Sequence, residues 1–211
     1  MSTRIGGVLL LLAGIALPII IIDYVMVMSS FDGGADATNL QRAEFAKGVY
    51  AHLARGWAFE ILAICFVATA SFIFLDRPSR AGWSMAAVGA LVTIPMYAVM
   101  LGGYGEIFAQ PELDPDLYVV LRGITVIVFE VGQGLMMGGL GLVLFLEMAN
   151  PARLLPKWLL LIGGLFNGFS GLVFLAMHLG ASVSLAIGAP FALIGLAITG
   201  LLGARLAARP S

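Results

Sequence analysis

The sequence predicts an all-α membrane protein in which six transmembrane helices form one domain. The chain has 211 residues, of which 61% are hydrophobic and only 11% are charged, and its mean hydropathy is +1.04. Soluble domains usually carry about 25% charged residues, so this chain has too few polar groups to cover its apolar surface in water. Its apolar residues form six runs, each close to the roughly 20 helical residues that cross the ~30 Å hydrocarbon layer of a bilayer.

The six predicted spans occupy residues 5–28, 54–75, 82–104, 118–147, 157–180 and 184–204. The first begins after Arg4. It is longer than the apolar segment of a signal peptide, about 7–15 residues, and no cleavage motif follows it directly, so we interpret it as an uncleaved span. Residues 39–53 precede the second span, with Thr38 or Asn39 as a candidate N-cap. They are predicted to form a helix on the membrane surface or an extension of that span.

Basic residues fall unevenly on the two ends of the predicted bundle. One end is predicted to hold seven of them, namely Arg4, Arg77, Arg80, Arg153, Lys157, Arg205 and Arg209. The other end is predicted to hold four basic residues, namely Arg42, Lys47, Arg55 and Arg122. Most of the carboxylates are predicted to lie at that end too. Because basic residues collect on the cytoplasmic side of membrane proteins, both termini are predicted to be cytoplasmic and the outer face to be acidic.

A faint internal repeat relates the second and third spans to the fourth and fifth. Residues 74–83 contain Phe-Leu-Asp, then Pro-Ser-Arg and Trp, and residues 145–158 contain Phe-Leu-Glu, then Pro-Ala-Arg and Trp. Glu60 lies 14 residues before the first segment and Glu130 lies 15 residues before the second. Duplication of a helical hairpin explains the pattern, and so does convergence, because cytoplasmic hairpins commonly carry basic residues and an interfacial Trp.

Glu60 and Glu130 are the most informative positions for function, because each falls inside an apolar run. A charged acid in hydrocarbon costs at least ~2.5 kcal/mol, so such residues usually face the bundle interior or water and find a partner. The two carboxyl groups are predicted to lie at similar depth on parallel helices, where they could share a proton or bind a cation. In the alternative interpretation, each acid pairs with an arginine, Arg122 or Arg55, and the pairs only fasten the helices together. Gln133, one helical turn from Glu130, completes this group of candidates for a binding or proton site.

A metal or haem site at the outer ends of the spans is a further hypothesis. Imidazole and carboxylate suit divalent ions, and imidazole with thioether suits copper(I). The candidate ligands are His52, His178, Asp23 and Glu106, with Met26, Met28, Met96, Met100 and Met177 towards the same side. No metal-ligand spacing occurs, and the lone Cys65 excludes a disulfide or a cysteine-ligated centre within one chain. No cofactor is therefore predicted.

Glycine is abundant, with 27 residues, and its spacing predicts close helix packing. Gly134 and Gly138 in the fourth span, and Gly164 and Gly168 in the fifth, are four residues apart. This spacing lets membrane helices approach closely. Two prolines inside spans are predicted to kink their helices by removing a backbone hydrogen bond, namely Pro18 and Pro95.

The segment Arg153-Leu154-Leu155-Pro156-Lys157-Trp158, followed by Gly163-Gly164, resembles a signature of an uncharacterised family of six-span bacterial membrane proteins, a domain-of-unknown-function family. Members of that family often have an acidic residue in an Ile/Leu setting in the second span, which matches Glu60-Ile61-Leu62. The resemblance covers the general layout and residues 54–175, although the basic residue expected within the third span is absent from residues 87–100. It implies the six-span topology and no particular activity. We expect the chain to lie in a membrane of the bacterial inner-membrane type.

Three functions are compatible with this pattern. We prefer a small-solute or proton-coupled transporter with an outward-facing polar site. The alternatives are an accessory or scaffold subunit, whose Gly-rich helices pack on a membrane-protein partner or a second copy, and an outer-face metal or haem protein. No nucleotide-binding, hydrolase or zinc-protease motif occurs, so an enzyme is less favoured. The few charges lie between long apolar runs and give no basis for nucleic-acid binding.

Overall fold

The computed structural model describes residues 2–34, 36–181 and 185–209, and within them it contains helices and no strand. Six helical segments are long and apolar enough to cross a membrane, which confirms the predicted all-α six-span bundle. The elements are α1 (Ser2–Ser29), α2 (Asn39–Ile73), α3 (Arg80–Ala98), η1 (Val99–Gly103), α4 (Tyr104–Ala109), α5 (Pro115–Ala149), α6 (Lys157–His178) and α7 (Leu185–Ala207). Residue 184, where the predicted sixth span begins, lies outside the described residues. The chain is thus a multi-pass membrane protein.

Capping side chains set the starts of the two longest helices. At α2 the Gln41 amide donates to the Thr38 hydroxyl at 3.2 Å, and the Thr38 amide donates to the Gln41 side-chain oxygen at 2.8 Å. This reciprocal capping box satisfies two amides that would otherwise lack a partner. At α5 the Asp114 carboxylate accepts from the amides two and three residues later, both at 3.0 Å. Residues 39–53 are therefore an extension of the second span, and Thr38 is its N-cap.

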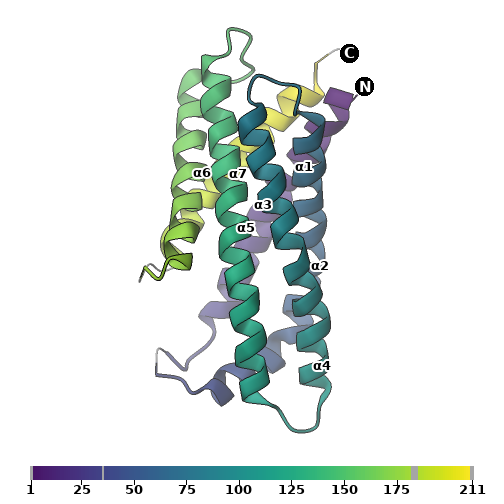
Figure 1. Cartoon of the computed structure of the whole chain (residues 1–211), viewed down its shortest axis with the longest axis vertical. Coiled ribbons are helices and arrows are strands. Elements are labelled where there is room, and N and C mark those ends of the chain that lie inside the picture. The colour runs from purple at the N-terminus through teal and green to yellow at the C-terminus, as the bar shows by residue number, and fades with distance from the viewer. Residues whose placement is uncertain (1, 35, 182–184, 210–211) are drawn as a thin grey trace.

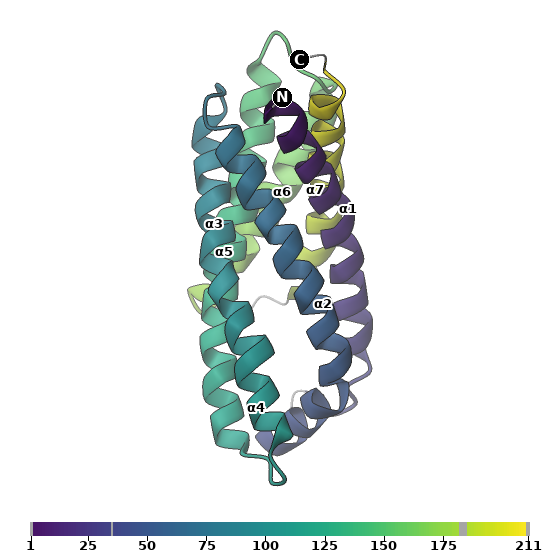
Figure 2. The same cartoon turned by 90° about the vertical axis from the view of Figure 1, so that its right-hand side faces the viewer.

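The six spans form a closed ring. Each spanning helix packs against its neighbours in the chain, and α1 also packs against α7. We call the end where α1 begins and α7 ends the terminal end, and the turns at 74–79 and 150–156 lie there too. Residues 30–34, 36–38 and 110–114 lie at the opposite, distal end (Figure 1 and Figure 2). α5 has 35 residues and α6 has 22, or about 52 Å against about 33 Å at 1.5 Å per residue. The longer helix therefore extends beyond the shorter one toward the distal end (Figure 1).

The third span is one helical rod over residues 80–109 that contains a wider π-helical turn, η1. This turn begins four residues after Pro95, which has no amide hydrogen to donate. Its altered geometry turns the residues that follow relative to a regular helix. The Tyr50 hydroxyl of α2 donates to the Leu101 carbonyl within η1 at 2.7 Å. Pro18, by contrast, lies within an uninterrupted α1.

The two halves of the proposed repeat are only partly alike. α2 and α5, which carry Glu60 and Glu130, have the same length. Trp83 is fully buried and its ring N–H donates to the Ser79 hydroxyl at 3.0 Å, whereas Trp158 is 60% exposed. The repeat remains a prediction, because the two helices agree in length whereas the two Trp side chains differ in exposure.

Glycine residues bring α5 and α6 into backbone contact. A Cβ atom added at Gly141 would lie 2.8 Å from the Gly168 amide nitrogen, and one added at Gly171 would lie 2.7 Å from the Gly138 amide nitrogen. No real side chain fits at such distances without moving a backbone. The close approach that was predicted for the fourth and fifth spans is confirmed.

Two further helix pairs meet in the same way. A Cβ atom on Gly82 of α3 would lie 2.6 Å from the Val143 amide nitrogen of α5, and one on Gly14 of α1 would lie 2.5 Å from the Gly200 Cα atom of α7. Large side chains fill the terminal half of the ring beside these contacts, including Leu10, Phe74, Trp83, Leu144, Leu160 and Leu206. Backbone contact and these side chains make the terminal half closely packed.

We expect Gly141→Ala to lower the free energy of unfolding by about 1–3 kcal/mol, because its methyl group overlaps the backbone of α6. Gly123→Ala in the same helix is the matched control, since a Cβ atom there meets nothing within 4 Å. The control should be neutral or up to about 1 kcal/mol more stable, because alanine favours helix over glycine. Unfolding of both variants in one detergent measures the difference, and equal losses would contradict the proposed backbone contact.

Candidate functional site

A cavity of about 430 Å³ lies inside the distal half of the ring. All six spanning helices line it. On α1 the lining residues run from Leu17 to Met28, in the half of the helix far from its start. Nearer the terminal end, Leu10, Phe74 and Trp83 are at most 1% exposed. The bundle is therefore hollow in its distal half and packed in its terminal half.

The cavity wall is largely apolar and carries four charged side chains among its described residues. They are Arg42, Glu60, Arg122 and Glu130. A polar site was predicted from the sequence, whereas aliphatic, aromatic and thioether groups make up most of this wall. Charged groups in such surroundings interact strongly with whatever enters, because little water screens them.

Glu60 of α2 and Glu130 of α5 line the same cavity, although 70 residues separate them in the chain. Glu130 is buried, and its carboxylate lies 3.8 Å from Nδ1 of His178 at the end of α6. Glu60 forms no ion pair with any part of the chain that the structure describes. The Tyr97 hydroxyl faces the Glu60 carboxyl, but the geometry falls short of a standard hydrogen bond. The two acids therefore differ, because Glu130 has an imidazole within ion-pair distance and Glu60 has no basic group that close among the described residues.

The alternative in which each acid is fastened by an arginine is wrong for the described residues. Arg122 does line the cavity, but no ion pair joins it to either acid. Arg55 lies outside the cavity, is exposed, and donates from Nε to the Ala51 carbonyl of its own helix at 3.2 Å. Five residues separate Arg55 from Glu60, which is about 500° of helical rotation, or 140° away around the helix. The two side chains consequently leave opposite sides of α2.

Lining residues on α5 follow the three- and four-residue spacing of one helix face. Gln133 lies one turn beyond Glu130, is buried, and lines the cavity. Thr125 and Phe129 continue the same stripe toward Arg122. Residues three and four apart stack on one side of a helix, so α5 presents an acid, an amide and a guanidinium to one space.

An aromatic cluster at the distal end completes the wall, and sequence reasoning missed it. Tyr104 is its centre, with ring centroids 6.0 Å from Trp57 and 5.7 Å from Tyr118. The Tyr104 hydroxyl forms a 2.9 Å hydrogen bond with the Thr125 hydroxyl, and Phe108 packs one turn away. A usable signal was present, because Met96, Met100, Tyr104 and Phe108 are spaced by four residues and all line the cavity.

The residues proposed as metal ligands do not assemble into one site. His52 Nε2 and Asp23 Oδ2 lie 2.9 Å apart as an exposed pair, and His178 belongs with Glu130. Glu106 is exposed on α4. Within residues 2–34, 36–181 and 185–209, no three His, Cys, Asp or Glu side chains come together as metal ligands would. These pairs do not supply the donor set that the metal hypothesis needs.

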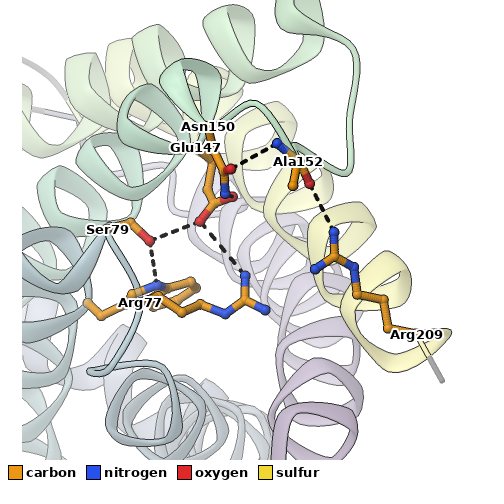
Figure 3. A network of polar contacts seen from close by, with 7 residues as sticks. Arg77, Ser79, Glu147, Asn150, Ala152 and Arg209 are labelled. Carbon is orange, nitrogen blue, oxygen red and sulfur yellow. Dashed lines mark hydrogen bonds and ion pairs between the residues drawn. The ribbon is translucent and has the colours of Figure 1, made fainter. Parts of the chain in front are cut away.

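A polar network ties the two turns at the terminal end together (Figure 3). Glu147, near the end of α5, is only 2% exposed and accepts hydrogen bonds from the Ser79 hydroxyl at 3.1 Å and the Asn150 amide at 3.3 Å. Nη1 of Arg77 lies 3.9 Å from the same carboxylate. Arg209 donates to the Ala152 carbonyl at 2.9 Å and so attaches the end of the chain to the second turn.

Arg77 holds its charge inside this network. Burial lowers the pKa of its guanidinium, and the Glu147 carboxylate raises it again. An arginine stays protonated at neutral pH, because its ordinary pKa lies far above neutral. The guanidinium also lies over the Phe74 ring, 5.2 Å from its centroid. Charge and packing therefore both hold the first turn against α5.

We expect Glu147→Ala to lower the free energy of unfolding by about 2–4 kcal/mol, because it leaves Ser79, Asn150 and Arg77 without their shared acceptor. Asp76→Ala is the control, since this carboxylate lies in the first turn and is exposed. The control should change the free energy by less than about 0.5 kcal/mol. Thermal unfolding in detergent compares them, and similar losses would show that the network contributes nothing specific.

No family model, curated protein or solved structure matches the chain. The resemblance noted from the sequence therefore remains a prediction. Function has to be argued from the chemistry of the cavity.

Proposed function

We propose that this protein is a membrane transporter that exchanges a small solute for protons at Glu60 and Glu130. One observation carries the proposal, which is that two acids from separate spans line a single cavity in the distal half of the bundle. Ionisable residues inside membrane proteins usually mark substrate or proton pathways. A purely structural acid would instead be expected to have its partners in place, as Glu147 does.

The coupling follows from competition for the same carboxylate. An ionised acid in apolar surroundings is costly unless a proton or a cation neutralises it. Glu60 has no ion-pair partner in the described parts of the chain, so a proton or a solute has to fill that role. When one binds, the other leaves. Movement of solute in one direction is thereby linked to movement of protons in the other.

Release on the other side of the membrane requires the terminal end to open. The turns at 74–79 and 150–156 are held together there by the Glu147 network. A closed network and a packed terminal half correspond to the state that is open at the distal end. Separation of these two turns would give the opposite state, as in transporters that rock around a central site.

The orientation of this cycle follows from the basic residues. The terminal end carries the larger group, including Arg77, Arg80, Arg153 and Arg205, and such residues favour the cytoplasm. We propose cytoplasmic termini in a membrane of the bacterial inner-membrane type. The cavity then faces the outside and draws its solute from there.

We expect Glu60→Gln and Glu130→Gln each to slow proton flux by about tenfold or more, because the amide cannot carry a proton across the cycle. The measurement uses purified protein in liposomes with a trapped pH dye, and proton flux is started by an imposed gradient of the solute under test. Glu106→Gln is the control, since this acid is exposed and lies outside the cavity. Unchanged flux in both cavity variants would remove the proposal.

We expect a membrane-impermeant maleimide to label Glu112→Cys in intact cells and to label Arg153→Cys only after the cells are opened. Both positions are exposed, one at each end of the bundle. The native Cys65 is first replaced by serine, since it is the only cysteine in the chain. The reverse labelling pattern would show that the cavity faces the cytoplasm.

A further inference from the structure

We propose that the solute is an apolar organic monocation, which binds with its charge beside Glu60 and Glu130 and its apolar groups against the rings and thioethers of the cavity. The inference rests on the proposed function for the transport step, but binding itself depends only on the cavity. The class is defined by its chemistry, namely one delocalised or fully substituted positive charge enclosed in hydrocarbon.

The size and the lining of the cavity favour an apolar ligand. Its volume of about 430 Å³ lies within the range of sites for small organic molecules, roughly 300–1,000 Å³. Six of the ten methionines in the chain line it, namely Met28, Met96, Met100, Met136, Met137 and Met177. Thioether side chains are flexible and polarisable, so they adapt to apolar groups of different shape. A strongly hydrated solute would gain little from such a wall.

The placement of charge favours a cation at depth. Arg42 and Arg122 lie nearer the distal end than the acids, because Arg42 precedes Glu60 by 18 residues and Arg122 precedes Glu130 by eight, about 27 Å and about 12 Å along their helices. Arg42 is also directed at its own loop, where it donates to the Ala37 carbonyl at 3.1 Å. The acids therefore dominate the deeper part of the cavity.

Glu60 is the carboxylate that a bound cation would neutralise. Glu130 already has His178 nearby, whereas no described cation lies within ion-pair distance of Glu60. A ligand cation in this place neutralises the carboxylate without the dehydration that a small metal ion would require. It therefore supplies a partner that the chain itself lacks.

Aromatic rings surround the path to that carboxylate. Trp57 lies one turn before Glu60 on α2, and both line the cavity. Tyr24 of α1 lines the same cavity. Tyr104 and Tyr118 also line it, and the Tyr104 ring lies 6.0 Å from the Trp57 ring. Aromatic faces attract organic cations, and Trp and Tyr do so more strongly than aliphatic side chains.

Charge also distinguishes this class from an anionic amphiphile. A fatty acid or a similar anion could meet Arg122 nearer the distal end, but it would then share the cavity with two carboxylates, of which only Glu130 has a base, His178, beside it. A cation would be repelled by Arg42 and Arg122 nearer the distal end and attracted by Glu60 and Glu130 deeper in the cavity. The sign of the ligand charge is therefore the decisive measurement.

Tetraphenylphosphonium and tetraphenylborate provide that measurement, because they are close in size and shape and opposite in charge. Each is titrated into the full chain in nanodiscs of zwitterionic lipid while tryptophan fluorescence is followed, with empty nanodiscs subtracted. We expect the cation to bind and the anion to bind at least about tenfold more weakly. Trp57→Phe should remove the fluorescence change, since Trp83 is fully buried and Trp158 lies outside the cavity.

Glu60→Gln should weaken binding of the cation by about tenfold or more, and Glu106→Gln should leave it unchanged. A calorimetric titration of Glu60→Gln, with unfolding monitored beside the native chain, separates lost binding from lost structure. Equal or tighter binding of tetraphenylborate would overturn the inference. Unchanged affinity of Glu60→Gln for the cation would overturn it as well. Cation binding without proton flux would support this inference and remove the transport proposal, whereas Glu60-dependent flux without cation binding would do the reverse.

Discussion

Close contact between helix backbones is the interaction on which the rest of this structure depends. Lipid tails are as apolar as leucine, so burying side chains between membrane helices gains little from the hydrophobic effect, and association relies on short-range dispersion contacts. Glycine supplies these contacts where α1 meets α7, α3 meets α5, and α5 meets α6. Toward the distal end the pattern changes, because a Cβ atom at Gly48, Gly56 or Gly123 would meet nothing within 4 Å. The same ring is therefore tight at one end and hollow at the other.

This asymmetry gives Glu147 and Glu60 different surroundings. Glu147 lies in the tight half, where Ser79, Asn150 and Arg77 occupy its carboxylate, and it acts as a fastening. Glu60 lies beside the hollow half and has no such set of partners within the described chain. An ionised acid in apolar surroundings without partners is unfavourable, which is why we propose Glu60 as the group that takes a proton or a cation. This contrast supports the proposed transport function, which itself rests on the shared cavity of Glu60 and Glu130.

The fold also explains why the outer polar residues did not form the metal site that their chemistry suggested. Residues at the same depth on different helices of a ring are separated by the hollow between them, and only direct neighbours meet. Asp23 and His52 meet because α1 packs on α2, and Glu130 and His178 meet because α5 packs on α6. Each contact joins two groups, whereas a metal site needs three or more ligands to converge.

Hydropathy alone determined the six spans and their class, because a chain in a bilayer must satisfy its backbone within helices and must offer lipid an apolar surface. The same reasoning identified Glu60 and Glu130, since acids inside apolar runs stand out by type. The residues that surround them depend on how each helix is rotated about its axis and on the order of the helices around the ring. The hydropathy pattern of a single span does not predict either. Tertiary packing therefore decided that Arg55 faces away, that His178 accompanies Glu130, and that Trp57, Tyr104 and Tyr118 enclose the cavity.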